Sequence, residues 1–538
     1  MTFKQIQKPI HDLPTFRFGL ADRQSPDEIN DFEMADCENV SVEEDSAMSA
    51  PGYMLWDSAP QSHPGPYWGG FLFTRSDGWV IDVRQRRGTL EYSGDGIEEW
   101  IECTLPTAGS PATTVELTQC QPTFAQLNDI LIWTNGYDSV MSSIDGITWT
   151  LEPTIPKSKV VFNNGMNRLL YLAQPDSPYR FDWSGINDPL TIGASSYQLV
   201  DPNNNGIILG AASTPDGATL VFKQNAIYNI AEFVDDGIID IQYVGSARPV
   251  GHHTIQTTEN SVIFALWGDG FIAEYIGGNI RTIAGKIDIT GRNNSLRMEL
   301  FTSAYYNGKY HLSMPDSNIS NDYNSQEYII YKNLMRDDPY QPYVITRNRR
   351  YIGCYWIEDT EFDYGRDITL YIGDSRPLTT SGSPAAYDNT LFAWVNDFRE
   401  ISWGEGLDNQ PQDCFFTTKY FTENVPYYTK RFKKLFSNFK VTNDLTVTLS
   451  YRFLPYGTWT DKEVTMTANE LDMIYDDLTE GGLSEGYSFA DDTLGNVFID
   501  IENSDKPKGI QFKVSWSQVS DVQLYGMAYQ FRMKPKFK

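Results

Sequence analysis

The sequence is poor in cysteine and in positive charge, and each shortage argues against a class of protein. Its five cysteines are scattered over 538 residues, and no CxxC pair occurs. That spacing argues against a structural zinc site and against a framework of disulfides. Lysine and arginine number 42 against 71 aspartates and glutamates, so the formal net charge is −29. Because nucleic-acid binders and proteins of anionic membrane surfaces need cationic faces, this balance argues against both classes.

Long apolar runs and helical periodicity are missing as well. No run approaches the roughly 18 residues of a membrane-spanning helix. The first residues, MTFKQIQKPIHD, lack the apolar core of a signal peptide. We therefore expect a soluble protein, made in a reducing cytoplasm, with no membrane insertion. No helical periodicity persists between residues 65 and 390, and the only helix that we expect farther along spans residues 469–477.

Aromatic residues are abundant instead, and they occur in short runs typical of strands. Phenylalanine, tryptophan and tyrosine make up 14% of the chain, and their flat side chains pack well on a pleated sheet. Residues 220–230 contain two apolar runs joined by a polar corner at 223–225. Residues 262–275 repeat this arrangement around the corner Gly268-Asp269-Gly270. Both segments predict β-hairpins.

Hairpins of this kind recur at irregular spacing, six or seven times, from about residue 65 to residue 390. Small antiparallel sheets repeated along a chain are typical of a β-propeller. The sequence therefore predicts an all-β fold with a β-propeller of six or seven irregular blades at residues 61–385. A set of stacked β-sandwiches is the alternative fold for this region.

The two ends of the chain differ from this central region. Residues 1–60 hold an acidic stretch at 22–45 between two strand-like phrases. They predict an extended N-terminal arm, and a disordered acidic leader fits its middle equally well. Residues 378–389 (LTTSGSPAAYDN) are typical of a linker. Beyond them, alternating strands such as 445–453 predict a C-terminal β-sandwich at residues 386–538.

Three short patterns look like ligand sites, but each is better explained as structure. His252 and His253 are neighbours at the start of an expected strand, where adjacent side chains point to opposite faces and do not readily share one metal. Residues 201–206 (DPNNNG) match the first half of a calcium loop, yet Ala212 stands where the bidentate acid belongs. Residues 143–149 (SIDGITW) resemble the Asp-box of sialidase-type propellers, which is a structural corner. We therefore expect no metal, no cofactor and no catalytic residues.

Three basic clusters stand out against the acidic background. The first two are Arg84 with Arg86 and Arg87, and Arg347 with Arg349 and Arg350. Each either contacts phosphates or docks against an acidic neighbour, such as the acidic arm of another subunit. The third cluster is interleaved with aromatic residues, a composition typical of protein interfaces. We expect a subunit interface that includes Tyr427, Tyr428, Lys430, Arg431, Lys433 and Lys434.

Several phrases of the sequence occur in an order that resembles one family. They are Gly19-Leu20, an acidic spacer, the strand 37–42 (CENVSV), Pro51-Gly52-Tyr53, the turn 182–189 (DWSGINDP), the hairpin 221–228 (VFKQNAIY) and the corner 268–271 (GDGF). In this order they are similar to the tail hub or nozzle proteins of short-tailed bacteriophages, also called tail tubular protein B or packaged-DNA stabilisation proteins. Ser49-Ala50 depart from the pattern, because the family usually has basic residues before the Pro-Gly turn.

The resemblance implies a structural virion protein that is not an enzyme. Such proteins form a ring in the viral tail, usually a homohexamer, below the portal and the head-tail adaptor or connector ring. The ring extends the DNA channel, retains the packaged genome until ejection, and anchors tail fibre, spike or needle proteins. The resemblance also implies assembly in the bacterial host cytoplasm and passage of double-stranded DNA without sequence-specific binding.

Two alternatives to this function stay open. One is a receptor-binding or adhesin propeller at the tail tip. The other is a glycan-degrading tail enzyme, which would need two carboxylates about 5–10 Å apart.

The net charge is consistent with a DNA conduit. A basic wall would bind phosphates and stall the passing DNA, whereas an acidic wall repels the DNA toward the axis. We therefore expect acidic residues to be enriched on the channel face. The sequence does not identify the individual channel acids.

Overall fold

The structure is a computed structural model, and it describes residues 10–13, 19–23, 25, 28–30, 33–42, 46–50, 53–57, 66–94, 100–108, 113–204, 206–233, 239–267, 271–288, 297–362, 365–374, 391–394, 413–422, 430–441, 445–454, 457–466, 495–502, 507–517 and 522–533. The helices among these residues are two short 3-10 turns, η1 (His252–Thr254) and η2 (Met298–Leu300). None of the described helices is long and apolar enough to cross a membrane. The predicted all-β fold class is confirmed. The expected linker at 378–389 and the expected helix at 469–477 lie outside the described residues.

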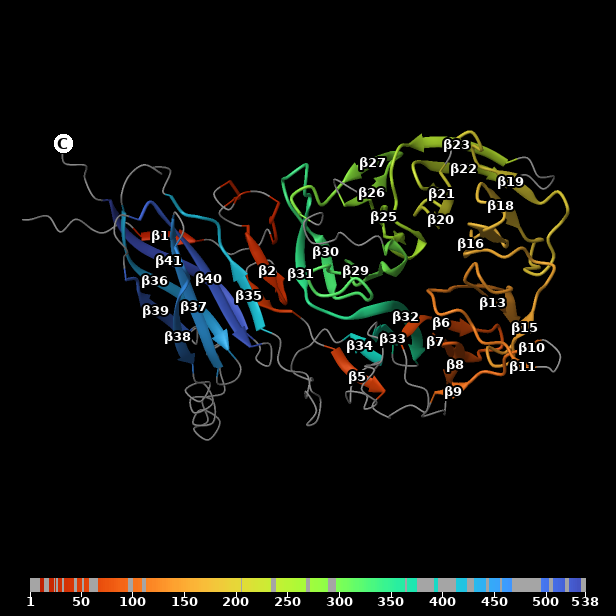
Figure 1. Cartoon of the computed structure of the whole chain (residues 1–538), viewed down its shortest axis with the longest axis horizontal. Helices are drawn as coiled ribbons and strands as arrows, with labels where there is room; N and C mark the ends of the chain where they lie inside the picture. Colours follow the sequence, from red (N-terminus) through yellow and green to blue (C-terminus); the bar gives the residue numbers. More distant parts are fainter. Residues whose placement is uncertain are drawn as a thin grey trace, which may run out of the picture.

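Seven antiparallel sheets of four strands follow one another along the described part of the chain (Figure 1). The first contains β6 (Tyr67–Thr74), β7 (Val80–Arg86), β8 (Thr89–Gly94) and β9 (Ile101–Glu102). After the small hairpin β10 (Thr107–Ala108) and β11 (Thr113–Thr114) come β12 (Thr123–Leu127), β13 (Ile130–Thr134), β14 (Met141–Ser143) and β15 (Thr150–Leu151). The third sheet contains β16 (Val160–Asn163), β17 (Leu169–Leu172), β18 (Arg180–Trp183) and β19 (Tyr197–Leu199).

The remaining four-stranded sheets repeat this plan. The fourth contains β20 (Ile208–Ser213), β21 (Thr219–Lys223), β22 (Ile227–Phe233) and β23 (Ile239–Gly245). In the fifth are β24 (Gln256–Thr257), β25 (Val262–Ala265), β26 (Ile272–Ile276) and β27 (Asn279–Thr282). The sixth contains β28 (Thr302–Tyr306), β29 (Lys309–Met314), β30 (Gln326–Met335) and β31 (Tyr343–Asn348). The last consists of β32 (Ile352–Phe362), β33 (Gly365–Asp374), β34 (Leu391–Trp394) and β5 (Tyr53–Asp57).

The first strands of the seven sheets form a closed ring. Each contacts the first strand of the next sheet, in the order β6, β12, β16, β20, β24, β28 and β32, and β32 returns to contact β6. A closed ring of small antiparallel sheets is a β-propeller, and Figure 1 shows the sheets arranged radially. The predicted propeller is therefore confirmed in preference to stacked β-sandwiches.

Apolar clusters fill the space between neighbouring propeller sheets. Trp133 of β13 packs in one cluster with Val83 of β7, and Phe222 of β21 lies edge-on to Phe264 of β25, with ring centroids 5.1 Å apart. A sheet that is covered on both faces needs apolar residues at successive positions rather than at alternate ones. This explains why the successive residues Leu220, Val221 and Phe222 are all buried.

The other unit is a β-sandwich of two sheets, which lies beside the propeller in Figure 1. One sheet has the order β3 (Val40–Val42), β4 (Ala47–Ser49), β41 (Val522–Met533), β36 (Lys430–Val441) and β39 (Gly495–Asp500), and β1 (Ile10–Leu13) also pairs with β41. The second has the order β2 (Asp36–Glu38), β35 (Asp413–Thr417), β40 (Gly509–Ser517), β37 (Leu445–Leu454) and β38 (Thr460–Met466).

Where the structure describes the expected N-terminal arm, its residues form short strands that pair within both units. Strand β2 pairs with β35 in one sandwich sheet, and β4 pairs with β41 in the other. Strand β5 pairs with β34 and completes the last propeller sheet, so that sheet extends beyond the expected boundary at residue 385. The physical reason is that backbone donors and acceptors at a sheet edge need a partner strand, and short N-terminal strands supply it.

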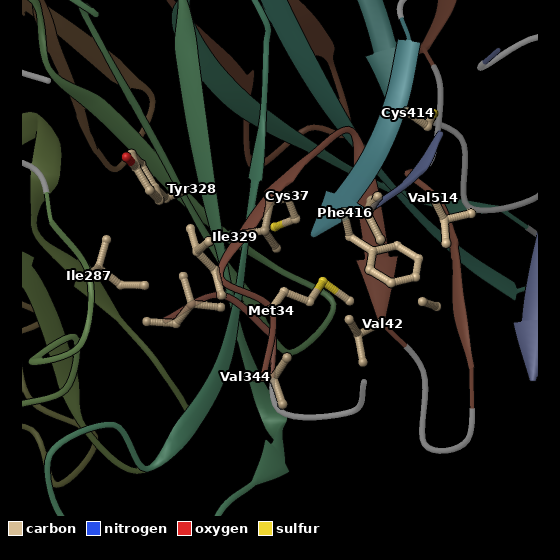
Figure 2. Close-up of a cluster of buried hydrophobic side chains, with 14 of the residues drawn as sticks. Met34, Cys37, Val42, Ile287, Tyr328, Ile329, Val344, Cys414, Phe416 and Val514 are labelled. Atoms are coloured by element: carbon tan, nitrogen blue, oxygen red, sulfur yellow. The ribbon is translucent and has the colours of Figure 1, made fainter. Parts of the chain in front are cut away.

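The sandwich and the propeller share one apolar core. Met34 and Val42 from the N-terminal segment lie between Ile329 of the propeller and Phe416 and Val514 of the sandwich (Figure 2). Phe416 is fully buried in this cluster. Because the core continues across the junction, the two units form one packed body within the described residues.

We predict that a chain lacking residues 1–60 loses its cooperative unfolding transition. The deletion removes the strands that pair with β34, β35 and β41, and it exposes the edges and the core that they cover. Circular dichroism melting and light scattering would measure the effect, with a chain lacking only residues 1–9 as the control. A monomeric deletion variant that melts like the full chain would contradict this view of the N-terminus.

Candidate functional site

The N-terminal segment is bound to the propeller by buried ion pairs. Glu33 is fully buried; Lys286 Nζ lies 2.7 Å from its Oε1, and Arg336 contacts the same oxygen. Arg347 of β31 is also buried, and its guanidinium lies 2.7 Å from Asp36 Oδ1. Two arginines of this basic cluster, Arg347 and Arg350, therefore pair with acidic residues of their own chain, whereas Arg349 is exposed.

These side chains stay ionised in spite of their burial. Burial by itself would raise the pKa of Glu33, but the hydrogen bond from Lys286 and the charge of Arg336 outweigh it and hold this pKa below its usual value. Burial by itself would lower the pKa of Arg347, but Tyr328 and the neighbouring acidic groups outweigh it and raise this pKa. A buried ion pair adds little net stability, but loss of one partner leaves a buried charge uncompensated. We interpret the pairs as fixing the position of the segment.

Backbone hydrogen bonds hold the start of this segment in place. Leu20 N donates to Ile345 O at 2.8 Å, and Gln341 Nε2 donates to Leu20 O at 2.9 Å. Gly19 has a φ of +67°, and a Cβ at this position would collide with the carbonyl oxygen of Ile345. The Gly-Leu phrase noted in the sequence thus has a physical reason, because only glycine lets the chain approach β31 so closely.

A second buried charged cluster lies in the sixth propeller sheet and centres on Glu327. Its carboxylate lies 2.9 Å from His311 Nδ1 and 2.8 Å from an Arg350 nitrogen, and it accepts a hydrogen bond from Tyr355 at 3.0 Å. Burial alone would raise the pKa of Glu327, but Arg350, together with hydrogen bonds from His311 and Asn348, lowers it to about 2. The cluster therefore holds an ionised carboxylate inside the fold.

The Tyr355 ring also lines a cavity of about 140 Å³ at one end of the ring of first strands. Trp68, Phe124, His253 and Thr302 contribute to the same wall. Burial lowers the pKa of His253 to about 3, so this imidazole is neutral at pH 7.

Cys354 also lines this cavity, and its thiol is the candidate nucleophile among the lining residues. Burial raises the pKa of its thiol to about 12, so it is protonated at pH 7. Cysteine chemistry needs a thiolate, which an adjacent base or cation must stabilise. The neutral His253 does not supply that charge, so this pair does not have the electrostatics of a cysteine nucleophile.

The two adjacent histidines occupy η1 rather than the expected strand. Their rings pack edge to face, with centroids 5.7 Å apart. Burial lowers the pKa of His252 to about 4, so both rings are neutral at pH 7. Within the described ranges, no group of three or more histidine, cysteine or acidic side chains could hold a metal ion.

The calcium-like loop encloses a cation that belongs to the chain itself. Lys223 Nζ donates to the carbonyl oxygens of Val200 and Asp201 at 2.8 Å and of Asn204 at 3.0 Å. This lysine is fully buried, and its burial lowers its pKa. Asp201 is fixed in turn by the Tyr228 hydroxyl at 2.7 Å. The sequence places Lys223 at a hairpin corner, and only the fold shows that it fills this loop.

The Asp-box-like phrase forms the corner between β14 and β15. Asp145 Oδ1 accepts hydrogen bonds from Ile147 N at 2.9 Å, from Thr148 N at 2.7 Å and from Ser143 Oγ at 2.9 Å. These bonds close the turn on itself. The phrase is thus a structural corner, as the sequence indicated.

Two members of the first basic cluster, Arg84 and Arg86, are buried within the fold, whereas Arg87 is exposed. Arg84 is fully buried, lies 2.8 Å from Glu91 Oε2 and stacks over Trp100 at 3.6 Å from the ring centroid. Arg86 is buried beside the same acid. Neither guanidinium faces solvent, so neither contacts a phosphate of a passing ligand.

The third basic cluster lies on β36, and the structure divides its members. Lys430 is fully buried and donates to the carbonyl oxygen of Lys508 at 2.7 Å. It therefore does not lie on the surface, where we expected it to form a contact. Arg431 is exposed, Lys433 is half-buried, and Lys434 lies 3.8 Å from Asp500. Tyr427 and Tyr428 lie outside the described residues. Alternation along the strand explains why Lys430 is buried and Arg431 is exposed. A register shift between Phe432 and Lys434 then interrupts the alternation.

No protein-family model matches the chain, and no curated protein is significantly similar to it. Among solved structures, YCF48 from Cyanidioschyzon merolae is similar at 12% identity, over 64% of this chain and 98% of that one, with a TM-score of 0.36. A puromycin hydrolase is similar at 10% identity, over 63% of this chain and 59% of that one, with a TM-score of 0.32.

We predict that Lys223→Met lowers the free energy of unfolding by about 1–3 kcal/mol, because the buried carbonyl oxygens lose their donor. Urea titration would measure the change. The matched control is Lys157→Met, because Lys157 donates to a single carbonyl, that of Tyr137, in an exposed setting. Equal stability of the two variants would show that the lysine does not organise the loop.

We also predict that Glu327 makes the fold sensitive to acid. Its folded-state pKa of about 2 is below the ordinary value of 4.5, so its stabilising contribution is present above pH 4.5 and is lost as the pH falls toward 2. Glu327→Gln should cost about 3–5 kcal/mol at pH 7, because it leaves the Arg350 charge buried and unbalanced. It should also flatten the dependence of stability on pH below pH 5.

Denaturant titrations between pH 2 and pH 7 would test this, with Glu502→Gln as the control. Glu502 is also paired, 2.9 Å from Lys462 Nζ, but its side chain is 77% exposed. Parallel pH profiles for the wild type and Glu327→Gln would overturn the assignment.

Proposed function

We propose that this chain is a structural, non-enzymatic subunit of a ring in the tail of a short-tailed bacteriophage. In this role it is the hub or nozzle that extends the DNA channel, retains the packaged genome and lets it leave at ejection. The observation that carries the proposal is the ordered series of phrases that resembles this family. Two of them now have a structural reason: Gly19-Leu20 sits against β31, and residues 221–228 span the corner of the β21–β22 hairpin.

The continuous junction between propeller and sandwich supports a mechanical role. Domains joined by a small polar contact move relative to one another by default. Here strands from the N-terminal segment pair within both units, and one apolar core runs across the junction (Figure 2). A force applied to one unit therefore passes to the other through sheet hydrogen bonds and packed side chains. A subunit that holds DNA under pressure needs such a connection.

The placement of charge supports passage of DNA without binding. Several cations, among them Lys286, Arg336, Arg347 and Arg350, are largely buried in ion pairs within the chain. The net charge of −29 therefore falls mainly on the surface. Repulsion by one charge is screened over about 10 Å in salt, but a ring of such chains adds to a continuous negative potential. DNA would be repelled from every wall of this channel.

The partners that we propose for this ring are those that the same family resemblance implies. They are copies of the chain itself, as a homohexamer, then the head-tail adaptor ring and the tail fibre, spike or needle proteins. The site of action is the virion tail, after assembly in the host cytoplasm.

Electron microscopy of the purified full-length chain would test the proposal. We expect rings with six-fold symmetry and a central opening, and a cryo-EM map in which acidic residues outnumber basic ones on the lumen. Antibody labelling of virions should place the ring at the junction of neck and tail.

Other outcomes would point to the alternatives. A chain that remains monomeric at micromolar concentration, or a mainly basic lumen, would contradict the proposal. Label on peripheral fibres would favour the receptor-binding alternative, and release of sugars from host polysaccharide would favour the glycan-degrading one.

A further inference from the structure

The outer face of one sandwich sheet carries an arginine, Arg452, on strand β37. The alternate residues of this strand from Val447 to Phe453 pack in the core, so Arg452 projects from the opposite face. Gln511 of the neighbouring strand β40 lies directly opposite Arg452 in the register. This arginine therefore stands on the side of the sheet that faces away from the sandwich core.

Two aromatic rings and one buried amide fix the Arg452 guanidinium. Its central carbon lies 4.5 Å from the centroid of the Trp459 ring and 5.3 Å from that of the Tyr420 ring. Its Nε donates to Gln511 Oε1 at 2.7 Å, and Gln511 Nε2 donates in turn to Thr418 O at 2.7 Å. Gln511 is 1% exposed, so this support is itself held within the fold. A guanidinium fixed in this way loses little conformational entropy when it binds a ligand.

The two terminal nitrogens of Arg452 have no hydrogen-bond or ion-pair partner among the residues that the structure describes. Within that part of the chain, the hydrogen bond of its side chain is the one from Nε to Gln511. The side chain is half-buried, and its terminal nitrogens are not enclosed by the protein. The end of the guanidinium is therefore open to a ligand from solvent.

The other arginines that stack on aromatic rings in the described ranges each bind a carboxylate of the chain. The pairs are Arg84 and Arg86 with Glu91, Arg180 with Asp182, and Arg281 with Glu274. Stacking holds the planar guanidinium, and the carboxylate takes its N–H groups. Arg452 has the stacking and lacks the carboxylate, so the same arrangement there calls for a carboxylate from outside the chain.

The charges near Arg452 favour a ligand that carries a single negative charge. Lys513 projects from the same face, two residues beyond Gln511 on β40. Asp461 and Glu463 of the edge strand β38 are exposed on this face as well, and they offset the two cations. A phosphate dianion would be repelled by both acids. A carboxylate has one charge, and its two oxygens match the parallel N–H groups of a guanidinium.

We propose that Arg452, held between Trp459 and Tyr420, binds the carboxylate of a small organic acid. The acid is either a sugar acid or an acidic amino acid, because both present the same carboxylate. The terminal nitrogens donate to the two carboxylate oxygens, and the two rings offer apolar surface to the carbon skeleton. This site is on the sandwich, and it does not depend on the proposed ring.

Ligand titrations of the full-length chain, followed by saturation-transfer NMR, would test the site. The probes are glucuronate and N-acetylglutamate, and their uncharged counterparts are glucose and N-acetylglutamine. We expect saturable binding of at least one acid, no binding of the uncharged counterparts, and weaker binding of inorganic phosphate. Tighter binding of glucuronate would identify sugar acids as the ligands, and tighter binding of N-acetylglutamate would identify amino acids.

Variants of the arginine provide the second half of the test. Arg452→Gln should weaken binding about tenfold or more, because hydrogen bonds to a charged group are lost. Arg452→Lys keeps the charge without the planar fork, so it should weaken binding less, and it decides the question if Arg452→Gln fails to fold. The matched control is Arg431→Gln, which removes an exposed arginine from the other sandwich sheet and should leave binding unchanged. Failure of both acids to bind, or equal binding by the wild type and the folded Arg452 variants, would overturn the site.

Discussion

The pairing of N-terminal strands with both halves of the molecule is the constraint on which the rest of the structure depends. Strand β5 completes the last propeller sheet against β34, and β2 and β4 join the two sheets of the sandwich. Each pairing closes an edge that would otherwise leave backbone groups without partners. The residues between these strands carry apolar side chains into one core and acidic side chains onto buried cations. Propeller closure, sandwich completion and the rigid junction therefore have a common cause.

The distribution of charge follows from this arrangement. Lys286, Arg336 and Arg347 form ion pairs with acidic residues of the N-terminal segment. These cations therefore neutralise acidic groups inside the fold. Lys223 fills a loop and donates hydrogen bonds to three of its carbonyl oxygens. The surface is left with most of the negative charge. In the channel that we propose, internal use of cations would be an advantage, because exposed cations would hold the phosphates of passing DNA.

The same features are consistent with the mechanical role that we propose. The cavity at the mouth of the ring is lined by a neutral imidazole and a protonated thiol, because burial disfavours the charged form of each. The ionised Glu327 is enclosed by its partners within the sixth sheet, where it positions Tyr355 and Arg350. Polar side chains in this fold mainly tie strands and turns together.

Local patterns in the sequence determined the all-β class, the hairpins such as residues 220–230 and the Asp-box corner, because neighbouring residues make their hydrogen bonds and set their alternation. They also revealed the basic cluster around Arg347, for which phosphate contact and docking against an acidic neighbour stayed open as alternatives. Only the tertiary structure decided that β2 pairs with β35 and β5 with β34, since these partners are more than 300 residues apart along the chain. It also decided that Lys430 is buried while Arg431 is exposed. A short strand can pair with any free edge, and which edge lies beside it depends on how distant residues pack.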